Sequence, residues 1–373
     1  MSDAPPPPDQ APGAPHPRET ARLFGQATAE ADFLRAFNAG RLHHGWLLHG
    51  PRGIGKATLA WRIARFLLAT PDADEGGMFD APPPPATLEI DADHPVARRL
   101  LTGADPGLAS ITRTINEKTG RMRDEIVAED TRRLNRFFGL SATDNGRRVV
   151  VIDTADEMNP WAANALLKML EEPPARTTIL LVSHQPSRLL PTIRSRCRGL
   201  RLVPLGPDDM TRALGETGAG TPEQPEHLAA LASGSVGDAL RLINLGGLQI
   251  YAELMAILAS LPQLDRPRAL ALAEAAAQRN AGERFELLLN LIDIAMARLA
   301  HTGAHGTPPL PEAANGEGQT LMRLAPNPES ARRWATVAAE IIQRSRQGKA
   351  VNLDPASLVL DTVFRMQDVS AGR

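Results

Sequence analysis

The chain has 373 residues, which is enough for two or three domains, and 43% of them are apolar. A formal net charge of −2 gives no overall field that would attract nucleic acid. The single cysteine, Cys197, excludes an intramolecular disulfide and a cysteine-based zinc site, and no run of 18 apolar residues exists to span a membrane. We therefore expect a globular protein of the reducing cytoplasm.

The amino-terminal region begins with a proline-rich tail and continues into regular structure. Residues 1–18 carry too little apolar surface to fold, so we expect a disordered tail. Apolar spacing predicts a helix at 29–39, and an apolar run at 46–48 predicts a strand. A glycine-rich stretch follows. Two apolar stripes at helical spacing then predict a broadly buried helix: Leu59, Ile63 and Leu67, and Ala60, Ala64 and Leu68.

The middle of the chain alternates strands and helices. Residues 71–93 are rich in proline and glycine and predict an exposed, mobile insertion. The pattern at 108–127 predicts a small hairpin, and 129–138 and 161–172 predict helices. Three apolar runs predict buried strands: 148–153, 178–182 and 200–203. Strands that alternate with helices form a parallel sheet, so residues 19–205 are expected to be an α/β domain.

The remainder of the chain is helical in pattern. Residues 206–247 carry short apolar repeats and predict a small helical lid domain. Residues 248–373 predict a longer all-α domain, interrupted by a Gly/Pro-rich loop at 301–328. Its expected helices are 250–261, 266–278, 283–299, 330–347 and 355–366. Their regularly spaced apolar residues are expected to form core and not a binding site.

A glycine-rich stretch, GPRGIGK, has the spacing of a phosphate-binding loop between a strand and a helix. Gly50, Gly53 and Gly55 allow backbone N–H groups to turn toward phosphate oxygens, and Lys56 reaches the terminal phosphates. The next position normally carries a Ser or Thr hydroxyl that binds Mg²⁺, but here it is Ala57. A plain glycine turn in an ordinary α/β domain is the other interpretation.

A second nucleotide-binding carboxylate is expected at the end of the strand at 148–153. Asp153 follows an apolar run, as does the Asp that holds Mg²⁺ in nucleotide-hydrolysing proteins. In many such enzymes the next residue is a Glu that activates water, but here it is Thr154, which is no base near neutral pH. Asp156 and Glu157, one turn later, are the alternative candidates for that base.

Four motifs, taken in order, resemble the bacterial clamp-loader family, which are AAA+ proteins of DNA polymerase III. They are the glycine-rich stretch, the run Val-Val-Ile-Asp that ends at Asp153, the helix NALLKMLEEPP at 164–174, and the triplet Ser-Arg-Cys at 195–197. The resemblance covers residues 22–366. It implies a P-loop AAA+ α/β domain with a small helical lid, and an all-α collar at 248–373 that holds the subunits of a ring together.

Within this family the chain resembles the non-motor delta-prime subfamily and not the gamma/tau motors. Ala57 replaces the metal-binding Thr, and Thr154 replaces the catalytic Glu. Gly237 stands where the sensor-2 arginine of a motor would be. Three losses around one nucleotide imply that this chain does not hydrolyse ATP by itself. The implied site is then vestigial: Gly50, Gly53, Gly55, Lys56, Ala57, Thr58 and Asp153.

The resemblance gives Arg196 a role in catalysis on another chain. In this family the Ser-Arg-Cys arginine resembles an arginine finger that reaches the ATP of a neighbouring subunit. A planar guanidinium there neutralises charge on the transferring phosphoryl group. Charge alone favours another interpretation, a solvated basic edge made of Arg188, Arg194, Arg196, Arg198 and Arg201. Cys197 is expected to be a small packing residue and not a nucleophile.

The resemblance also implies partners and cofactors. The partners are gamma/tau motor subunits, a delta subunit, the ring-shaped sliding clamp and, through the assembly, primed DNA. ATP and Mg²⁺ are expected in the neighbouring subunit, and this chain requires no cofactor of its own. The family's cysteine module is missing, so no zinc is expected. The sequence leaves open whether Lys56 still binds ATP.

Two other functions are compatible with the sequence. The first is an active ATPase motor of the same family, in which Thr58 or a bridging water replaces the missing hydroxyl of residue 57. The second is a P-loop kinase or signalling NTPase that acts on a small substrate. This second interpretation predicts a metal-binding Ser or Thr and leaves the triplet at 195–197 unexplained.

Overall fold

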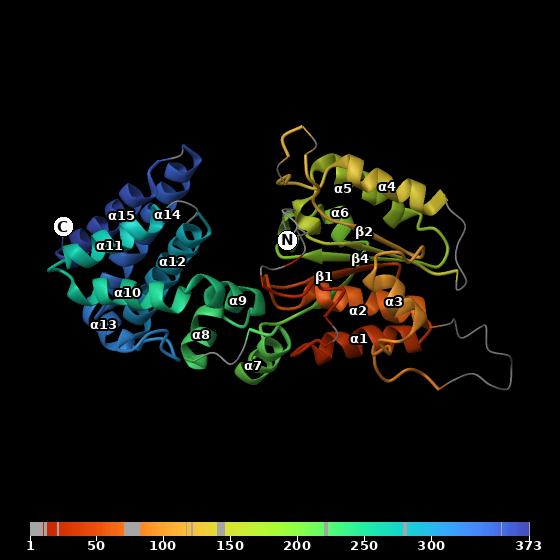
Figure 1. Ribbon diagram of the computed structural model, residues 1–373, viewed down its shortest axis with the longest axis horizontal. Helices are drawn as coiled ribbons and strands as arrows, with labels where there is room; N and C mark the ends of the chain where they lie inside the picture. The colour runs from red at the N-terminus through yellow and green to blue at the C-terminus, as the bar shows by residue number, and fades with distance from the viewer. Residues whose placement is uncertain are drawn as a thin grey trace. The chain divides into compact units, whose positions relative to one another are not determined.

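The computed structural model describes the chain except residues 1–9, 11–12, 21, 71–82, 117, 121, 140–145, 220–222, 279–281, 352 and 373. The described residues form two compact units (Figure 1). One comprises residues up to 217 together with 234–237, and the other comprises 218–233 and 238–373. Most of the predicted mobile insertion at 71–93 lies outside the described residues.

The first unit is built on a five-stranded sheet in the order β2-β3-β4-β1-β5, in which every pairing is parallel. The strands are β1 (Gly45–His49), β2 (Leu108–Ile111), β3 (Arg148–Ile152), β4 (Thr177–Ser183) and β5 (Arg198–Arg201). The apolar runs of β1, β3 and β4 are buried because they lie inside the sheet with both faces covered. The predicted parallel α/β sheet is confirmed.

Helices cover both faces of this sheet. Figure 1 shows α1, α2 and α3 on one face and α4 and α5 on the other. Both apolar stripes predicted for α2 are buried. The side chain of Asn159 caps α5 by accepting a hydrogen bond from the backbone N–H of Ala162. The helices of this unit are α1 (Ala27–Asn38), α2 (Lys56–Ala69), α3 (Pro95–Leu101), α4 (Ala128–Gly139), α5 (Pro160–Glu171), α6 (Pro191–Arg194) and α7 (Pro207–Glu216).

The hairpin predicted at 108–127 is wrong in part. Among its described residues, one isolated antiparallel bridge remains of it, between Ile115 and Met122. The first half, β2, instead pairs with β3 in the main sheet, with Leu108 opposite Val149. A parallel neighbour in a covered sheet buries the apolar residues of β2 better than an exposed two-stranded hairpin would.

The disordered tail predicted for residues 1–18 does not extend to its carboxyl end. The His16 side chain is buried, and its ring packs edge-on against Trp61 with the ring centroids 5.7 Å apart. The Arg65 guanidinium donates a hydrogen bond of 2.7 Å to the carbonyl oxygen of Arg18. These contacts of α2 order residues 16–18, which the composition alone does not indicate.

The second unit is helical. Its helices are α8 (Pro225–Ala232), α9 (Val236–Leu245), α10 (Gly247–Ser260), α11 (Arg266–Ala276), α12 (Gly282–His305), α13 (Glu317–Leu324), α14 (Pro328–Ala350) and α15 (Pro355–Ser370). The loop predicted at 301–328 was too long, because it contains the end of α12 and all of α13. Among the described residues no single helix has the length and apolar character to cross a membrane, and only α9 with α10, as a bent pair, passes that test.

A buried carboxylate fastens three helices of the second unit. Glu317 of α13 accepts hydrogen bonds from the Tyr251 hydroxyl of α10 (2.5 Å) and from Nε (2.7 Å) and Nη2 (2.8 Å) of Arg298 in α12. The backbone N–H of Ala313 donates a fourth, at 2.6 Å. Burial and the Glu317 charge raise the pKa of Tyr251 well above its usual range. The carboxylate is therefore fully satisfied, and it compensates the largely buried Arg298.

We expect Glu317→Ala to lower the free energy of unfolding by about 3–5 kcal/mol, because it leaves the Arg298 charge buried without its partner. Urea denaturation of the whole chain measures this. Glu253→Ala is the matched control, since Glu253 forms an exposed ion pair with Arg268 and its loss costs about 1 kcal/mol or less. Equal small losses in the two variants would contradict this role of Glu317.

Candidate functional site

The glycine-rich stretch at 50–56 forms the turn between β1 and α2, as predicted, and we call it the glycine loop. Gly55 precedes α2 with a φ of 95°, a left-handed conformation that favours glycine. Lys56 is the first residue of α2 and is only 3% exposed. Its ammonium donates a hydrogen bond to the carbonyl oxygen of Pro51. The lysine thus bonds to the backbone of its own loop.

Burial dominates the electrostatics of this lysine. It lowers the pKa of Lys56 to about 8, while the nearby carboxylates of Asp153 and Asp156 act in the opposite direction. The Arg52 charge lowers the pKa further. The carboxyl ends of β1 and β3 therefore meet around one ammonium group, as the parallel sheet requires.

The segment 234–237 packs directly on the glycine loop. The backbone N–H of Gly237 donates to the carbonyl oxygen of Gly53 at 3.2 Å. Gly53 has a φ of 73°, and a Cβ placed on it would lie 2.2 Å from Oγ of Ser235. The residue that the sequence places at the sensor-2 position is thus in contact with the loop. It has no side chain to offer to a ligand.

Oxygen atoms that would bind a metal are missing or engaged beside the lysine. Ala57 has none, and Thr58 is turned roughly 100° around the helix axis from residue 57. The Thr154 hydroxyl donates to the carbonyl oxygen of Asp153 at 2.7 Å. One carboxylate oxygen of Asp153 accepts the backbone N–H of Thr154 at 2.9 Å. Thr154 itself has a φ of 56°, which is unusual for a β-branched residue.

The two alternative candidates for a catalytic base both have other partners. The Asp156 carboxylate accepts the backbone N–H groups of His184 and Gln185, each at 3.1 Å. Oε2 of Glu157 lies 2.9 Å from Nε of Arg113, and both side chains are 22% exposed. Asp156 therefore fixes the turn after β4, and Glu157 forms an ion pair. Neither carboxylate is left to activate water.

His184 joins this site, although no motif in the sequence predicted it. It follows β4, the strand that lies between β3 and β1. Burial lowers the pKa of His184 to about 4, and the positive charge of Lys56 is the next largest cause. The ring is therefore neutral at pH 7. The signal in the sequence is its position directly after a predicted buried strand, where the carboxyl ends of parallel strands converge.

These residues do not fit a hydrolysable Mg²⁺–nucleotide. The lysine is bonded to its own loop, the metal-binding hydroxyl is absent, and the carboxylates that remain near it hold backbone groups. Among the residues that the structure describes, no cluster of three His, Cys, Asp or Glu side chains could hold a metal ion. No hydrolytic step in this chain can therefore be derived from its geometry.

Arg196 lies on the surface in the turn between α6 and β5, and its guanidinium is held in place. Nη1 donates to the carbonyl oxygen of Thr192 at 3.0 Å. Nη2 lies 2.9 Å from Oε1 of Glu171, the last residue of α5. The Arg196 side chain remains 37% exposed. No pattern in the sequence indicates this pair, because the two residues meet only in the folded chain.

The other residues of the basic edge differ from Arg196. Arg198 packs over the ring of Trp46, 5.2 Å from its centroid. The side chains of Arg188, Arg194 and Arg201 make no hydrogen bond or ion pair with the described residues. Burial raises the pKa of the Cys197 thiol to about 12, which agrees with a packing role and not with a nucleophile.

The glycine loop and Arg196 lie at opposite ends of β1. The loop follows His49 at the carboxyl end. The carbonyl oxygen of Arg196 lies 3.1 Å from the position that a Cβ on Gly45 would take, at the amino end. The four steps from Gly45 to His49, at about 3.3 Å each, separate the two ends by about 13 Å. The structure therefore does not bring Arg196 to the site around Lys56.

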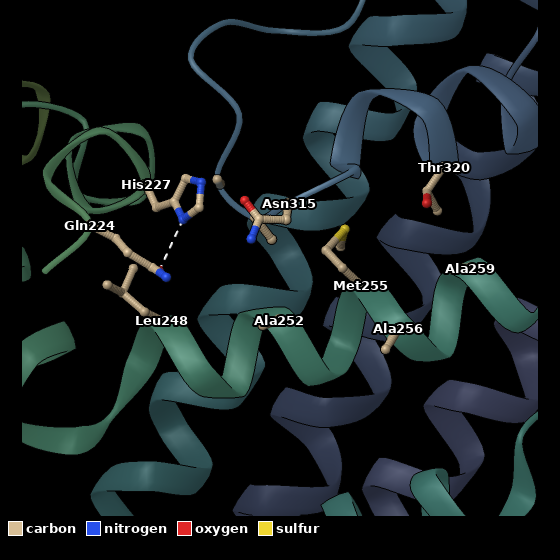
Figure 2. A pocket seen from close by; sticks show the side chains of 11 residues that line it. Gln224, His227, Leu248, Ala252, Met255, Ala256, Ala259, Asn315 and Thr320 are labelled. Atoms are coloured by element: carbon tan, nitrogen blue, oxygen red, sulfur yellow. Dashed lines mark hydrogen bonds between the residues drawn. The ribbon is translucent and has the colours of Figure 1, made fainter.

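The second unit contains a separate hollow of about 190 Å³, shown in Figure 2. Small and apolar residues of α10 line it, with Gln224 and His227 at one side. Nδ1 of His227 is 3.0 Å from Oε1 of Gln224. The lining residues include no carboxylate and no Lys or Arg, and His227 is their one ionisable side chain.

We expect Gly53→Ala to destabilise the chain by at least about 2 kcal/mol more than Gly40→Ala. Both glycines have a positive φ, so each substitution carries a similar conformational cost of about 1 kcal/mol. Only Gly53 faces other atoms closely, whereas a Cβ on Gly40 meets nothing within 4 Å. Urea unfolding measures both losses. Equal losses would show that segment 234–237 is not fixed against the loop.

The pH dependence of stability tests the buried ammonium of Lys56. Between pH 8 and 10.5 the folded chain releases this proton while the unfolded chain keeps it, so the stability of the native chain rises with pH. Relative to Lys56→Met, which cannot titrate, we expect the native chain to gain up to about 3 kcal/mol over this range. Lys168→Met, at an exposed position, should show the native pH dependence. Parallel curves for the native chain and Lys56→Met would contradict the burial.

Comparison with known proteins identifies the family. The family described as "DNA polymerase III, delta subunit" matches residues 25–206. DNA polymerase III subunit delta' of Pseudomonas aeruginosa is 37% identical over 207 residues, which are 54% of this chain and 56% of the relative. DNA polymerase III subunit tau of Escherichia coli is 30% identical over 297 residues, which are 74% of this chain and 40% of the relative. The chain thus spans about half the length of the curated relatives it matches.

Similarity to a solved structure is weaker. A gamma subunit-related protein of DNA polymerase III from Thermotoga maritima has 17% sequence identity and a TM-score of 0.39, with 91% of this chain and 100% of that chain covered. At this TM-score the likeness supports no conclusion, so the assignment rests on the sequence matches. Residues 25–206 thus match a subunit family of DNA polymerase III, and the chain is similar in sequence to its clamp-loader subunits delta' and tau.

Proposed function

We propose that this chain is a non-motor clamp-loader subunit of the delta-prime type in DNA polymerase III. In this role it hydrolyses no ATP itself. It supplies Arg196 as an arginine finger, in trans, to the ATP of a neighbouring gamma/tau subunit while a sliding clamp is loaded during DNA replication. The observation that carries the proposal is the position of Arg196 at the end of β1 opposite to the glycine loop.

The state of the chain's own site supports the non-motor role. A motor needs a hydroxyl for Mg²⁺, a base for water and a lysine available to the phosphates. Here Ala57 has no oxygen, Thr154 bonds to the backbone, and the Lys56 ammonium bonds to Pro51. The alternative candidates for the base, Asp156 and Glu157, have other partners. An active motor would need all three functions restored together.

The position of Arg196 supports action on another chain. A guanidinium stabilises a phosphoryl group only at hydrogen-bond distance. About 13 Å of β1 separates Arg196 from its own loop, which supports a partner phosphate on a different subunit. Its two contacts also fix its plane, which lowers the cost of ordering it against a ligand. Arg188 and Arg194 on the same edge lack such contacts.

The proposed partners and cofactors follow from this role. The neighbouring gamma/tau subunit binds ATP and Mg²⁺, and this chain requires neither a cofactor nor zinc. A delta subunit, the sliding clamp and primed DNA complete the proposed assembly, in which the helices of the second unit form the collar. A net charge of −2 favours contact with DNA through the assembly and not through this chain alone. The lone Cys197 agrees with a cytoplasmic location.

The test is the DNA- and clamp-stimulated ATPase rate of a loader reconstituted with this chain, its gamma/tau and delta partners and their clamp. An arginine finger typically contributes about 10³–10⁵ in rate, or roughly 4–7 kcal/mol. We therefore expect Arg196→Ala to reduce turnover at the adjacent motor site by about 10³ or more. The total ATPase rate of the loader should fall by at least the fraction that this site contributes.

Two variants complete this experiment. Arg194→Ala, an exposed arginine two positions away, is the matched control and should retain the native rate. Lys56→Ala should also retain it, because the site around Lys56 is proposed to be inactive. A loss carried by Lys56→Ala would instead favour an active motor, with Thr58 or a water as metal ligand. Turnover of a small substrate by the isolated chain would favour a P-loop kinase or signalling NTPase.

A further inference from the structure

Glu171 is the one acidic side chain in contact with Arg196 among the described residues. It ends α5, and its Oε1 lies 2.9 Å from Nη2 of Arg196. The end of α5 is itself fixed beside β1, because Nε2 of His44 lies 3.0 Å from the carbonyl oxygen of Leu170. The carboxylate of Glu171 is therefore presented to Arg196 from a rigid position.

We propose that Glu171 is a positioning residue that orients the Arg196 guanidinium toward the phosphate of the neighbouring subunit. This inference rests on the proposed function of Arg196 and adds to it the residue that prepares the guanidinium. Glu171 does not touch the nucleotide. It acts through Arg196, by holding one edge of the guanidinium before the two subunits meet.

The hydrogen-bond capacity of the guanidinium permits this arrangement. A guanidinium has five N–H donors in one plane. The carbonyl oxygen of Thr192 takes one on Nη1, and Glu171 takes one on Nη2. Three donors remain for an incoming phosphoryl group, among them Nε–H and a second N–H on Nη2, which together match two phosphate oxygens. The two existing contacts thus fix the plane of the guanidinium and leave N–H donors for a ligand.

The location of Glu171 argues against a purely structural pair. A carboxylate at the carboxyl end of a helix faces the negative end of the helix dipole, which is unfavourable. Both partners are also partly exposed, at 37% and 49%, and exposed ion pairs contribute little to stability. A contact that adds little to stability and sits at an unfavourable helix end is better explained by its effect on the direction of Arg196.

Glu172, the next residue, provides the matched control. It is exposed, carries the same charge and lies at the same helix end, but it makes no side-chain hydrogen bond or ion pair with the described residues. Substitution of either glutamate changes the net charge equally. A difference between the two variants therefore reports the contact with Arg196 and not the local charge.

The experiment measures stimulated ATPase turnover in the reconstituted loader. We expect Glu171→Ala to lower kcat at the adjacent motor site about 10-fold, with KM for ATP unchanged, because the ATP of the neighbour makes no contact with Glu171. Glu171→Gln should lose less, since its amide oxygen still accepts from Nη2. Glu172→Gln should retain the native rate. In the Arg196→Ala background, Glu171→Ala should cause no further loss.

The possible outcomes separate this inference from the proposed function. If Arg196→Ala lowers the rate and Glu171→Ala does not, the positioning role is wrong and the arginine finger stands. If Arg196→Ala has no effect, the proposed function fails and the inference with it. A Glu171→Ala loss that persists in the Arg196→Ala background would overturn action through Arg196. A faster rate in Glu171→Ala would show restraint and not positioning. Thermal unfolding of each variant confirms that the chain is folded.

Discussion

The burial of the Lys56 ammonium at the carboxyl end of the sheet is the constraint on which the first unit depends. A buried cation needs partners, and here it finds the carbonyl oxygen of Pro51 and the field of Asp153 and Asp156. The turns after β1, β3 and β4 are gathered around it by the strand order β2-β3-β4-β1-β5. Among the described residues, no cluster of three His, Cys, Asp or Glu side chains lies there that could hold a metal ion.

The same strand keeps the two chemically distinct parts of the unit apart. β1 carries the glycine loop at its carboxyl end and packs against the turn of Arg196 at its amino end. The proposed action of Arg196 on a neighbour's phosphate uses only the amino end of β1 and leaves the glycine loop at the other end unused. Buried side chains of α5 pack against the sheet, and the helix ends at Glu171, beside the turn that carries Arg196.

Segment 234–237 shows how the site combines distant parts of the sequence. Gly237 contacts Gly53 although the two residues lie far apart in the sequence. Only glycine at position 53 permits this approach, because a Cβ there would overlap Ser235. The missing side chain at Gly237 thus lies against the glycine loop, and the sequence related these two segments only through a resemblance.

The sequence by itself determined the parallel sheet, the glycine loop and most helices, because buried strands and helices leave apolar periods of their own. It also placed Lys56 between the first strand and the next helix, and Asp153 at the end of a buried strand. It could not place His184 at the site, order residues 16–18, or move β2 from a hairpin into the main sheet. Nor could it pair Glu171 with Arg196. Those features were decided by the tertiary structure, because each depends on which surfaces meet after the sheet has closed, and such contacts have no period in the sequence.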